Sequence, residues 1–316
     1  MAVFTKLAKK EIEEFIDQYS IGHLESFNEI IEGIENTNYK IICDGTPYIL
    51  TVFEKRVNTN DLPFFMDLKL FLNKNDFKCP KPIINKFGTA INTIKNKSAV
   101  IISFIEGKKI NFPNVQECTE IGKIVGSLHK LTSKYNLKRE NSLGIKEWKK
   151  IYKKCEDVEN KFEGLFRDLK NEIIFIEDSW PESLPSGVIH ADLFKDNVFF
   201  EHGKITGVID FYFSCYHFFL YDIAIVVNDW CFEENGKIFN HDYFSAIVTG
   251  YSSIRELTAE ELSKFNLVSR AAAVRILITR LHDYIFHPEN AVVLKKDPYE
   301  YYNILKWHQN NNKIRS

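Results

Sequence analysis

The chain has 316 residues, of which 45% are hydrophobic and 27% are charged, with a formal net charge of −2. These values are typical of a globular protein with a core large enough for two lobes. The near-neutral charge excludes a general attraction to nucleic acid or to an anionic membrane, so neither is expected as a partner. The six cysteines form no Cys-x-x-Cys pair, and no stretch is apolar enough for a leader or a membrane span, which favours a reducing, cytoplasmic location.

The first third of the chain is predicted to form a mostly antiparallel sheet with two helices. Apolar side chains recur every three or four residues over 5–19, where Thr5 can cap a helix. A second helix is predicted over 61–74, with Asp61 as its cap and Pro63 in its first turn. Short apolar runs bounded by turn residues predict strands, with Asp44-Gly45 as a hairpin turn. The predicted strands cover residues 27–34, 39–43, 48–53, 83–86, 91–95 and 99–104.

The rest of the chain is predicted to be mainly helical. An apolar connector, residues 101–107, leads into it and is the expected hinge. The sequence therefore predicts an α+β protein with a small sheet lobe and a large helical lobe. One of its helices opens with a capping box at Thr258. The predicted helices cover residues 115–135, 145–176, 219–232, 240–254, 258–286 and 298–309.

A polar loop interrupts this helical part, in the sequence H-A-D-L-F-K-D-N over residues 190–197. Apolar runs at 188–189, 198–200 and 208–209 predict three short strands around it. His202-Gly203 is a tight-turn signal, so the last two strands are expected to form a hairpin. A hairpin would place Asn197, at the start of one strand, beside Asp210, at the end of the other. A third side chain, Asp192, lies one loop away.

This spacing of polar residues is typical of phosphoryl transfer. The reaction requires a carboxylate near the acceptor hydroxyl and oxygen ligands for Mg²⁺ on ATP. Asp192 is followed five residues later by Asn197, as in the catalytic loop of kinases, and Asp210-Phe211 follows thirteen residues further on. Asp192, Asn197 and Asp210 are therefore the predicted catalytic residues, with Asn197 and Asp210 as the metal ligands.

These motifs resemble those of the aminoglycoside phosphotransferase and choline kinase superfamily, which shares the protein-kinase fold. Protein kinases themselves are a poorer match, because Phe194 stands where serine/threonine kinases have lysine and no glycine follows Asp210-Phe211. The resemblance implies a bilobal protein-kinase-like fold. Its N-terminal nucleotide-binding lobe would cover residues 1–104, ending in a hinge at 103–107. A C-terminal helical lobe over 108–316 would hold the catalytic loop and the acceptor site.

More narrowly, the chain is similar to the bacterial homoserine kinases built on this fold. The resemblance implies ATP- and Mg²⁺-dependent phosphorylation of the γ-hydroxyl of L-homoserine, in threonine biosynthesis. Two positions stand out: aliphatic residues follow Arg275, where the family tends to have aromatic ones, and Thr51 replaces the phosphate-pairing lysine of protein kinases. Lys55 and Arg56 are nearby alternatives for that lysine. Eight motifs carry the resemblance, at residues 32–39, 50–54, 62–65, 190–198, 209–212, 220–224, 228–231 and 297–300.

The resemblance also suggests which residues contact ATP and which support the catalytic loop. The turn that contains Gly33, Asn36 and Asn38 is the candidate cover for the phosphates, since asparagine allows backbone N–H groups to face an anion. The connector residues Ser103, Phe104 and Ile105 are further candidates for ATP contact. His190 and Asp222 are expected to support the loop, and His129 is interpreted as a hydrogen-bonded structural histidine.

The acceptor site should offer an acid and a base, because homoserine carries an ammonium and a carboxylate, and arginine suits the carboxylate best. Asp229 and Trp230, and Arg275 or Arg280, are the candidates. Two alternatives stay open. One is a related kinase with another small acceptor, such as choline, an aminoglycoside or methylthioribose. The other is a catalytically inactive nucleotide-binding module, against which the intact loop residues argue.

Overall fold

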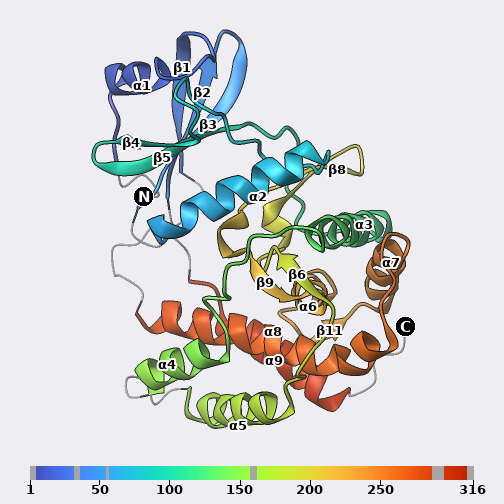
Figure 1. Ribbon diagram of the computed structural model, residues 1–316. Coiled ribbons are helices and arrows are strands. Elements are labelled where there is room, and N and C mark those ends of the chain that lie inside the picture. Colours follow the sequence, from blue (N-terminus) through green and yellow to red (C-terminus); the bar gives the residue numbers. More distant parts are fainter. Residues whose placement is uncertain (1–4, 32–35, 55–56, 157–161, 287–294, 312–316) are drawn as a thin grey trace. The chain divides into compact units, whose positions relative to one another are not determined.

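The structure is a computed structural model that describes residues 5–31, 36–54, 57–156, 162–286 and 295–311 (Figure 1). The chain divides into two compact units. The first is built from Met1–Gly107 together with Thr206–Tyr212, and the second from Lys108–Ile205, Phe213–Asn290 and the C-terminal Leu294–Ser316. No helix in the described ranges is long and apolar enough to cross a membrane.

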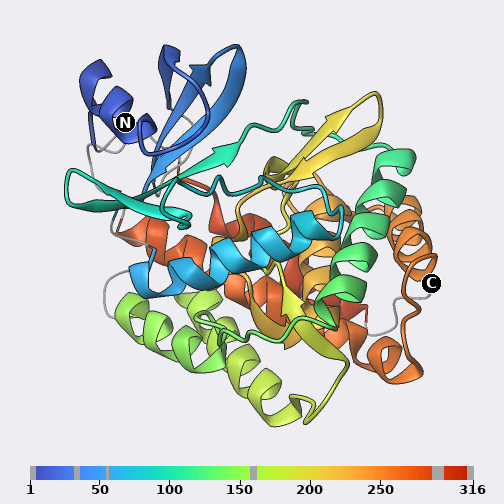
Figure 2. The same cartoon turned by 45° about the horizontal axis from the view of Figure 1, so that its top comes forward.

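The first unit is organised around a five-stranded antiparallel sheet (Figure 2). Residues in its second strand alternate between fully and partly buried, as expected when one face covers a core. The predicted hairpin turn is confirmed, because Asp44 and Gly45 both have positive φ between the second and third strands. The sheet order is β1 (Leu24–Ile30), β2 (Thr37–Cys43), β3 (Thr46–Val52), β5 (Lys97–Ser103) and β4 (Ile91–Ile94).

Two helices belong to this unit, α1 (Lys9–Ile16) and α2 (Leu62–Lys74). The first begins later than predicted, because the Thr5 hydroxyl donates to Glu54 Oε1 (2.6 Å) and does not cap a helix. The second begins where predicted, with Pro63 in its first turn, but Asp61 makes no capping hydrogen bond with its side chain.

The strand predicted over 83–86 is wrong. A single bridge between Pro82 and Ile102 forms there, without a strand. The side chain of Asn85 explains the difference, since its Oδ1 accepts hydrogen bonds from the backbone N–H groups of Phe87 (2.9 Å) and Thr89 (3.0 Å). These local bonds turn the chain where a strand would have to continue.

A segment from the middle of the sequence completes the first unit. The Tyr212 ring packs edge-on against Phe53 and Phe65, with ring centroids 5.3 and 5.5 Å apart. The backbone N–H of Val208 donates to the carbonyl of Lys78 (2.9 Å). Residues 206–212 thus close an apolar cluster made mostly by the first hundred residues.

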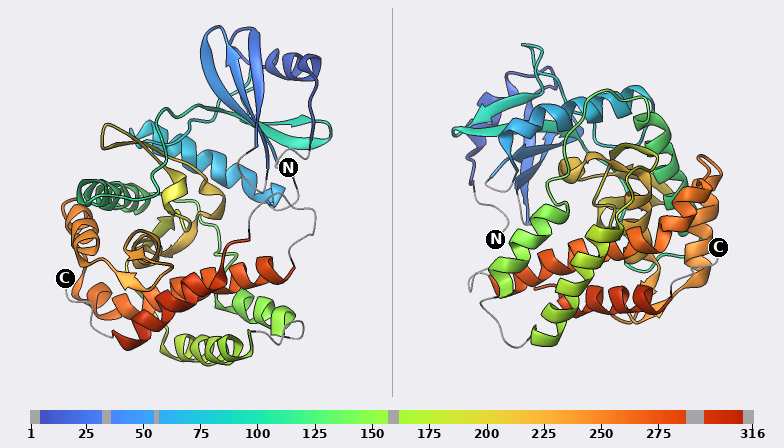
Figure 3. Two further views of the ribbon diagram at one scale, coloured as in Figure 1. Left: turned by 180° about the vertical axis from the view of Figure 1, so that it is seen from behind. Right: turned by 60° about the horizontal axis from the view of Figure 1, so that its bottom comes forward.

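The second unit is mainly helical, as predicted (Figure 3). Its helix α6 is buried on all sides, with 11 of its 12 residues buried. The capping box at Thr258 is present. The stretch predicted as helix over 145–176 forms two helices. The helices are α3 (Val115–Thr132), α4 (Ile145–Glu156), α5 (Glu163–Ser179), α6 (Phe219–Trp230), α7 (His241–Ser252), α8 (Ala259–Ile285) and α9 (Pro298–Asn310).

The described part of the chain also forms three pairs of short strands. β6 (Ser186–Ile189) pairs antiparallel with β9 (Cys215–Phe218), which the sequence did not predict. β7 (Val198–Glu201) and β8 (Lys204–Val208) form a two-stranded sheet, so the predicted hairpin is confirmed, with positive φ at His202 and Gly203. A further small pair, β10 (Phe232–Glu233) and β11 (Ile238–Phe239), was also not predicted.

Glycines allow α3 and α7 to lie side by side at short distance (Figures 1 and 3). A Cβ atom on Gly122 of α3 would lie 2.2 Å from the carbonyl oxygen of Ile247. A Cβ atom on Gly250 of α7 would lie 2.2 Å from that of Thr119. Both positions therefore exclude any larger residue unless the helices move apart.

Candidate active site

The loop that follows β6 is held by one carboxylate at the start of α6. Asp222 accepts hydrogen bonds from the backbone N–H groups of His190 (2.8 Å) and Ala191 (2.7 Å). Ala191 has a φ of 65°, a conformation that disfavours residues with a Cβ atom. The two bonds therefore fix a strained turn directly before Asp192.

A chain of buried side chains supports Asp222. Arg255 donates to the hydroxyl of Tyr251 (2.7 Å), which donates to His129 Nδ1 (2.9 Å), and His129 Nε2–H donates to Asp222 (3.2 Å). Burial lowers the pKa of His129 and keeps its imidazole neutral. Burial opposes ionisation of Asp222, but the hydrogen bonds from His129 and His190 outweigh it and hold the pKa of this carboxyl below its usual value.

Arg275, from α8, contacts the loop from another direction. Its side chain is 4% exposed. One of its guanidinium nitrogens donates to the carbonyl of Ala191, and the other lies 3.2 Å from Asp192 Oδ1. The strained residue is thus bound at its N–H by Asp222 and at its carbonyl by Arg275.

Asn197 lies at the end of the loop and contacts Asp192 in turn. Its Nδ2 donates to the backbone carbonyl of Asp192 (2.8 Å) and lies 3.4 Å from the Oδ2 of the same residue. Because the amide nitrogen is used in this way, the amide oxygen is the atom of Asn197 that can bind a cation.

Asp210, the third predicted catalytic residue, belongs to the first compact unit. Its φ is 64°, a left-handed conformation that aspartate tolerates better than most residues. The same unit contains Lys69 of α2, which is 3% exposed, with its ammonium 4.9 Å from the centre of the Tyr212 ring. Burial lowers the pKa of Lys69 to about 8, although the charges of Cys79 and Asp210 act in the opposite direction.

The residues predicted to contact ATP also lie in the first unit, apart from Gly33, Lys55 and Arg56, which fall outside the described residues. Asn36 Oδ1 accepts from the backbone N–H of Glu54 (3.3 Å), and Asn38 Oδ1 accepts from the Thr51 hydroxyl (2.8 Å). Asn38 therefore lies in β2 and not in the predicted turn, and its side chain binds β3, whereas Asn36 binds the chain just after β3.

The predicted connector continues from the end of β5. The Ser103 hydroxyl accepts from the backbone N–H of Lys81 (2.9 Å), and Lys40 lies 4.1 Å from the centre of the Phe104 ring. Ile105 packs against Gly207, where a Cβ atom would approach it to 2.6 Å. The connector is thus held by side-chain contacts on both sides.

The acceptor candidates Asp229 and Trp230 sit at the end of α6. Asp229 Oδ2 accepts from the backbone N–H of Lys195 (2.8 Å), and burial raises the pKa of Asp229. Trp230 is buried, and its indole N–H donates to the carbonyl of Leu193 (3.3 Å). Both residues therefore bind the loop that contains Asp192.

A group of charged residues surrounds Tyr301 of α9. This tyrosine is 1% exposed, and within the described part of the chain its hydroxyl has no hydrogen-bond partner. Burial raises its pKa well above the usual value, and the charges of Asp229, Glu300 and Asp192 add to this effect while Arg280 opposes it. Arg280 pairs with Glu300 and lies 4.4 Å from the Tyr301 ring centre.

Sequence reasoning did not single out Lys69, Tyr251, Arg255 or Tyr301. Lys69 had a usable signal, because it is a lysine on the apolar face of a predicted helix. Tyr251 and Tyr301 sit on helices and Arg255 follows the end of α7, all far along the chain from the loop, and no local pattern marks them.

The fold and this loop are those of a small-molecule phosphotransferase of the kinase type. Solved structures with the same fold include an amicoumacin kinase in complex with AMP-PNP and Ca²⁺ (TM-score 0.72, 17% identity, 96% of this chain and 93% of that chain). Choline kinase LicA from Streptococcus pneumoniae is a second (TM-score 0.65, 15% identity, 96% and 97%). At these identities the likeness establishes the fold alone, and the predicted protein-kinase-like fold is confirmed.

Among curated proteins, the homoserine kinase of Sinorhizobium fredii is 42% identical over 310 residues, which are 98% of this chain and 95% of that protein. The homoserine kinase of Rhizobium meliloti is 41% identical over the same shares. The sequence model of the phosphotransferase enzyme family matches residues 26–257 of this chain. The chain belongs to this family, and the predicted family resemblance is confirmed.

Proposed function

We propose that the protein is an ATP-dependent homoserine kinase, which transfers the γ-phosphoryl group of ATP to the γ-hydroxyl of L-homoserine. The product would be O-phospho-L-homoserine, on the way to threonine. The observation that carries the proposal is the 42% identity to a homoserine kinase over almost the whole of both chains. The hydrogen-bonded loop at Asp192 supports the reaction type, since it provides the carboxylate and amide that phosphoryl transfer requires.

In this proposal Asp192 orients the acceptor hydroxyl and accepts its proton late in the transfer. Arg275 binds one carboxylate oxygen of Asp192, and Asn197 lies near the other. The rotation of this carboxylate is therefore restricted before substrate binds. Catalysis of phosphoryl transfer consists mainly of such positioning, together with charge stabilisation.

Asn197 and Asp210 are the proposed ligands of Mg²⁺, because each offers an oxygen donor of the kind that this ion prefers. Within the described ranges no group of three or more His, Cys, Asp or Glu side chains could hold a metal ion by itself. A nucleotide-bound cation does not require such a group, because phosphate oxygens and water supply the other ligands. When bound, the ion would neutralise charge on the phosphates. The hydrogen bond from the Asn197 amide nitrogen to the Asp192 carbonyl fixes the orientation of this amide and leaves its oxygen available for the ion.

We assign the nucleotide to the predicted N-terminal lobe, residues 1–104 with the hinge 103–107, which falls within the first unit. Asn38 lies in β2, and the side chains of Asn36 and Asn38 accept hydrogen bonds from Glu54 and Thr51. The donors that we propose for the phosphates are therefore backbone N–H groups. Ser103, Phe104 and Ile105 remain the predicted contacts of the hinge.

For the acceptor we favour Arg280 over Arg275 as the ligand of the homoserine carboxylate. The guanidinium of Arg275 is already bound to the catalytic loop. Arg280 is paired with Glu300, which is more exposed and can exchange for a substrate carboxylate. Asp229 would then bind the ammonium group. The Tyr301 hydroxyl would donate to the substrate, since it has no partner within the described residues.

Release of ADP from ATP and Mg²⁺ tests the proposal over five acceptors at equal concentration: L-homoserine, choline, ethanolamine, methylthioribose and an aminoglycoside. We expect kcat/KM to be highest for homoserine by at least about tenfold. L-Threonine, whose hydroxyl is on the β-carbon, serves as the matched non-acceptor. Faster turnover of an acceptor without a carboxylate would refute the substrate while leaving the reaction type intact.

We also propose a cytoplasmic location and small-molecule partners only. All six cysteines are buried free thiols, which is consistent with a reducing compartment.

A further inference from the structure

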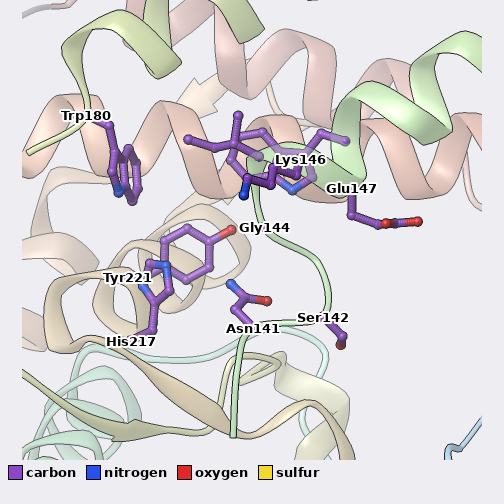
Figure 4. A pocket seen from close by; sticks show the side chains of 10 residues that line it. Asn141, Ser142, Gly144, Lys146, Glu147, Trp180, His217 and Tyr221 are labelled. Carbon is purple, nitrogen blue, oxygen red and sulfur yellow. The ribbon is translucent and has the colours of Figure 1, made fainter.

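A cavity of about 420 Å³ lies within the second unit (Figure 4). The start of α4, Trp180 after α5, His217 of β9 and Tyr221 of α6 line it. Neither Asp192 nor Asn197 is among the residues that line it, and neither are Asp229, Arg280 and Tyr301. The volume is in the usual range for pockets that bind small molecules, about 300–1,000 Å³.

Two of the residues that line this cavity, Tyr221 and His217, each have a buried polar atom without a hydrogen-bond partner among the described residues. The hydroxyl of Tyr221 and the Nδ1 atom of His217 are both buried, and neither makes a hydrogen bond to any residue that the structure describes. Tyr221 itself is 1% exposed. A buried polar group without a partner is destabilising by about 1–3 kcal/mol, and folded proteins contain few of them. Two such atoms beside one cavity indicate that something else supplies their partners.

The two atoms belong to rings in contact. The ring centroids of His217 and Tyr221 are 4.7 Å apart, and the Trp180 ring lies 6.0 Å from that of His217. In Figure 4 the Tyr221 hydroxyl is directed toward Gly144, between Trp180 and Asn141. The inner wall is thus aromatic, with a hydroxyl and an imidazole nitrogen as its polar atoms.

Charge limits what can bind there. Burial lowers the pKa of His217 to about 4, so its imidazole is neutral at physiological pH. Tyr221 is neutral as well, because burial raises its pKa far above the usual range. Lys146 and Glu147, at the start of α4, are the charged residues that line the cavity, whereas a charged group placed against His217 and Tyr221 would lose its hydration without a counter-ion there. The ligand that enters this wall must therefore be uncharged where it meets them.

The hydrogen-bonding pattern is more specific. The Tyr221 hydroxyl donates, and the neutral imidazole accepts at Nδ1 when its proton is on Nε2. A neighbouring carbonyl and N–H group on one edge of a ring would satisfy both. Flat rings also pack well against indole and imidazole faces. We propose that this cavity binds an uncharged planar ring with an amide or lactam edge, of the kind found in pyrimidine and purine bases.

Uracil provides the test, with 1,3-dimethyluracil as a matched probe that lacks the N–H groups. Saturation-transfer NMR titrations would use the full-length protein, with AMP-PNP and Mg²⁺ in excess so that the nucleotide site is filled. We expect saturable binding of uracil, with at least about fivefold weaker binding of the dimethyl compound, the loss expected for one or two uncharged hydrogen bonds.

Three variants connect the binding to the cavity. Tyr221→Phe removes only the unpartnered hydroxyl, so it should fold at least as stably as the wild type and bind uracil about fivefold more weakly or worse. Trp180→Ala removes the flat wall and should abolish saturable binding. Tyr216→Phe is the control. Tyr216 is an exposed residue of β9, the strand that contains His217, and does not line the cavity, so this variant should bind uracil as the wild type does.

Other results overturn the proposal. The cavity holds only water if neither uracil nor hypoxanthine binds saturably up to its solubility. It is not the binding site if Tyr221→Phe and Trp180→Ala bind uracil as the wild type does, or if raising the AMP-PNP concentration displaces the probe.

Discussion

Replacing Arg275 by methionine should lower kcat without changing the KM for homoserine. Methionine has a similar length and is apolar, so the space is filled while the two hydrogen bonds to the catalytic loop are lost. Because Arg275 touches Ala191 and Asp192 and is 3% exposed, it has no surface through which to bind substrate first. The sequence placed it with the acceptor, whereas these contacts support a positioning role.

The size of the effect follows from the two bonds. A buried carbonyl that loses its donor is destabilised by about 1–3 kcal/mol, and a hydrogen bond to a charged group contributes about 1.5–3 kcal/mol. The Asp192 side chain is 16% exposed, so water can replace part of what is lost. We expect the free energy of unfolding to fall by about 3 kcal/mol, at the lower end of the range for a broken buried ion pair. If about 2 kcal/mol of this is lost from the transition state, kcat falls about 30-fold.

The assay is initial-rate ADP release at saturating ATP over a range of homoserine concentrations, with urea unfolding measured in parallel. Arg280→Met is the matched control. Because Arg280 is the proposed ligand of the substrate carboxylate, this variant should raise the KM for homoserine and change kcat little. In an Asp192→Asn background, Arg275→Met should lower kcat by much less than 30-fold, because the pair no longer exists. A KM raised more than about tenfold at unchanged kcat would refute the positioning role and return Arg275 to the substrate carboxylate.

Three further predictions concern the catalytic loop, pH and helix packing. Asp192→Asn should bind ATP as the wild type does in calorimetry yet lose turnover by about a thousandfold or more, and unchanged turnover would rule out the proposed mechanism. Burial lowers the pKa of His308 to about 3, so below about pH 6.5 the unfolded chain takes up a proton that the folded protein does not. The contribution of neutral His308 to the free energy of unfolding is therefore complete above pH 6.5 and is lost as the pH falls toward 3, by about 2 kcal/mol at pH 5. Urea unfolding of His308→Gln should show a pH dependence weaker by that amount. Identical pH profiles for the variant and the wild type would contradict this. Gly122→Ala should lower the melting temperature by several degrees, which corresponds to a loss of about 1–3 kcal/mol in the free energy of unfolding. Gly164→Ala is the control and should not lower it, because a Cβ atom there meets nothing within 4 Å. Equal melting temperatures for the two variants would show that α3 and α7 adjust freely.

The parts of the site that the sequence predicted are local in the chain. The spacing of Asp192 and Asn197 could be read directly, because one loop holds both and their contact spans five residues. The turns at Asp44-Gly45 and His202-Gly203 were equally readable, since few residues accept positive φ.

The contacts that tie the loop to the rest of the second unit could not be read in the same way. Arg275 reaches Asp192 across 83 residues of sequence, and although the apolar residues around it indicate burial, no local pattern names its partner. β9 was missed because its four residues, Cys-Tyr-His-Phe, alternate too briefly to indicate a strand. The strand predicted over 83–86 was wrong because an asparagine side chain competed for the backbone.

The apolar cluster that Tyr212 closes has a consequence for the order in which the chain folds. Phe53 and Phe65 are translated long before the aromatic ring that covers them. A nascent chain that has reached residue 107 contains all five strands of the first sheet but still exposes this part of its interior. The first unit is therefore expected to remain open on the ribosome, and available to chaperones, until residues 206–212 have emerged. Asp210 belongs to the same segment, so the first unit acquires its predicted metal ligand when residues 206–212 pack against its core.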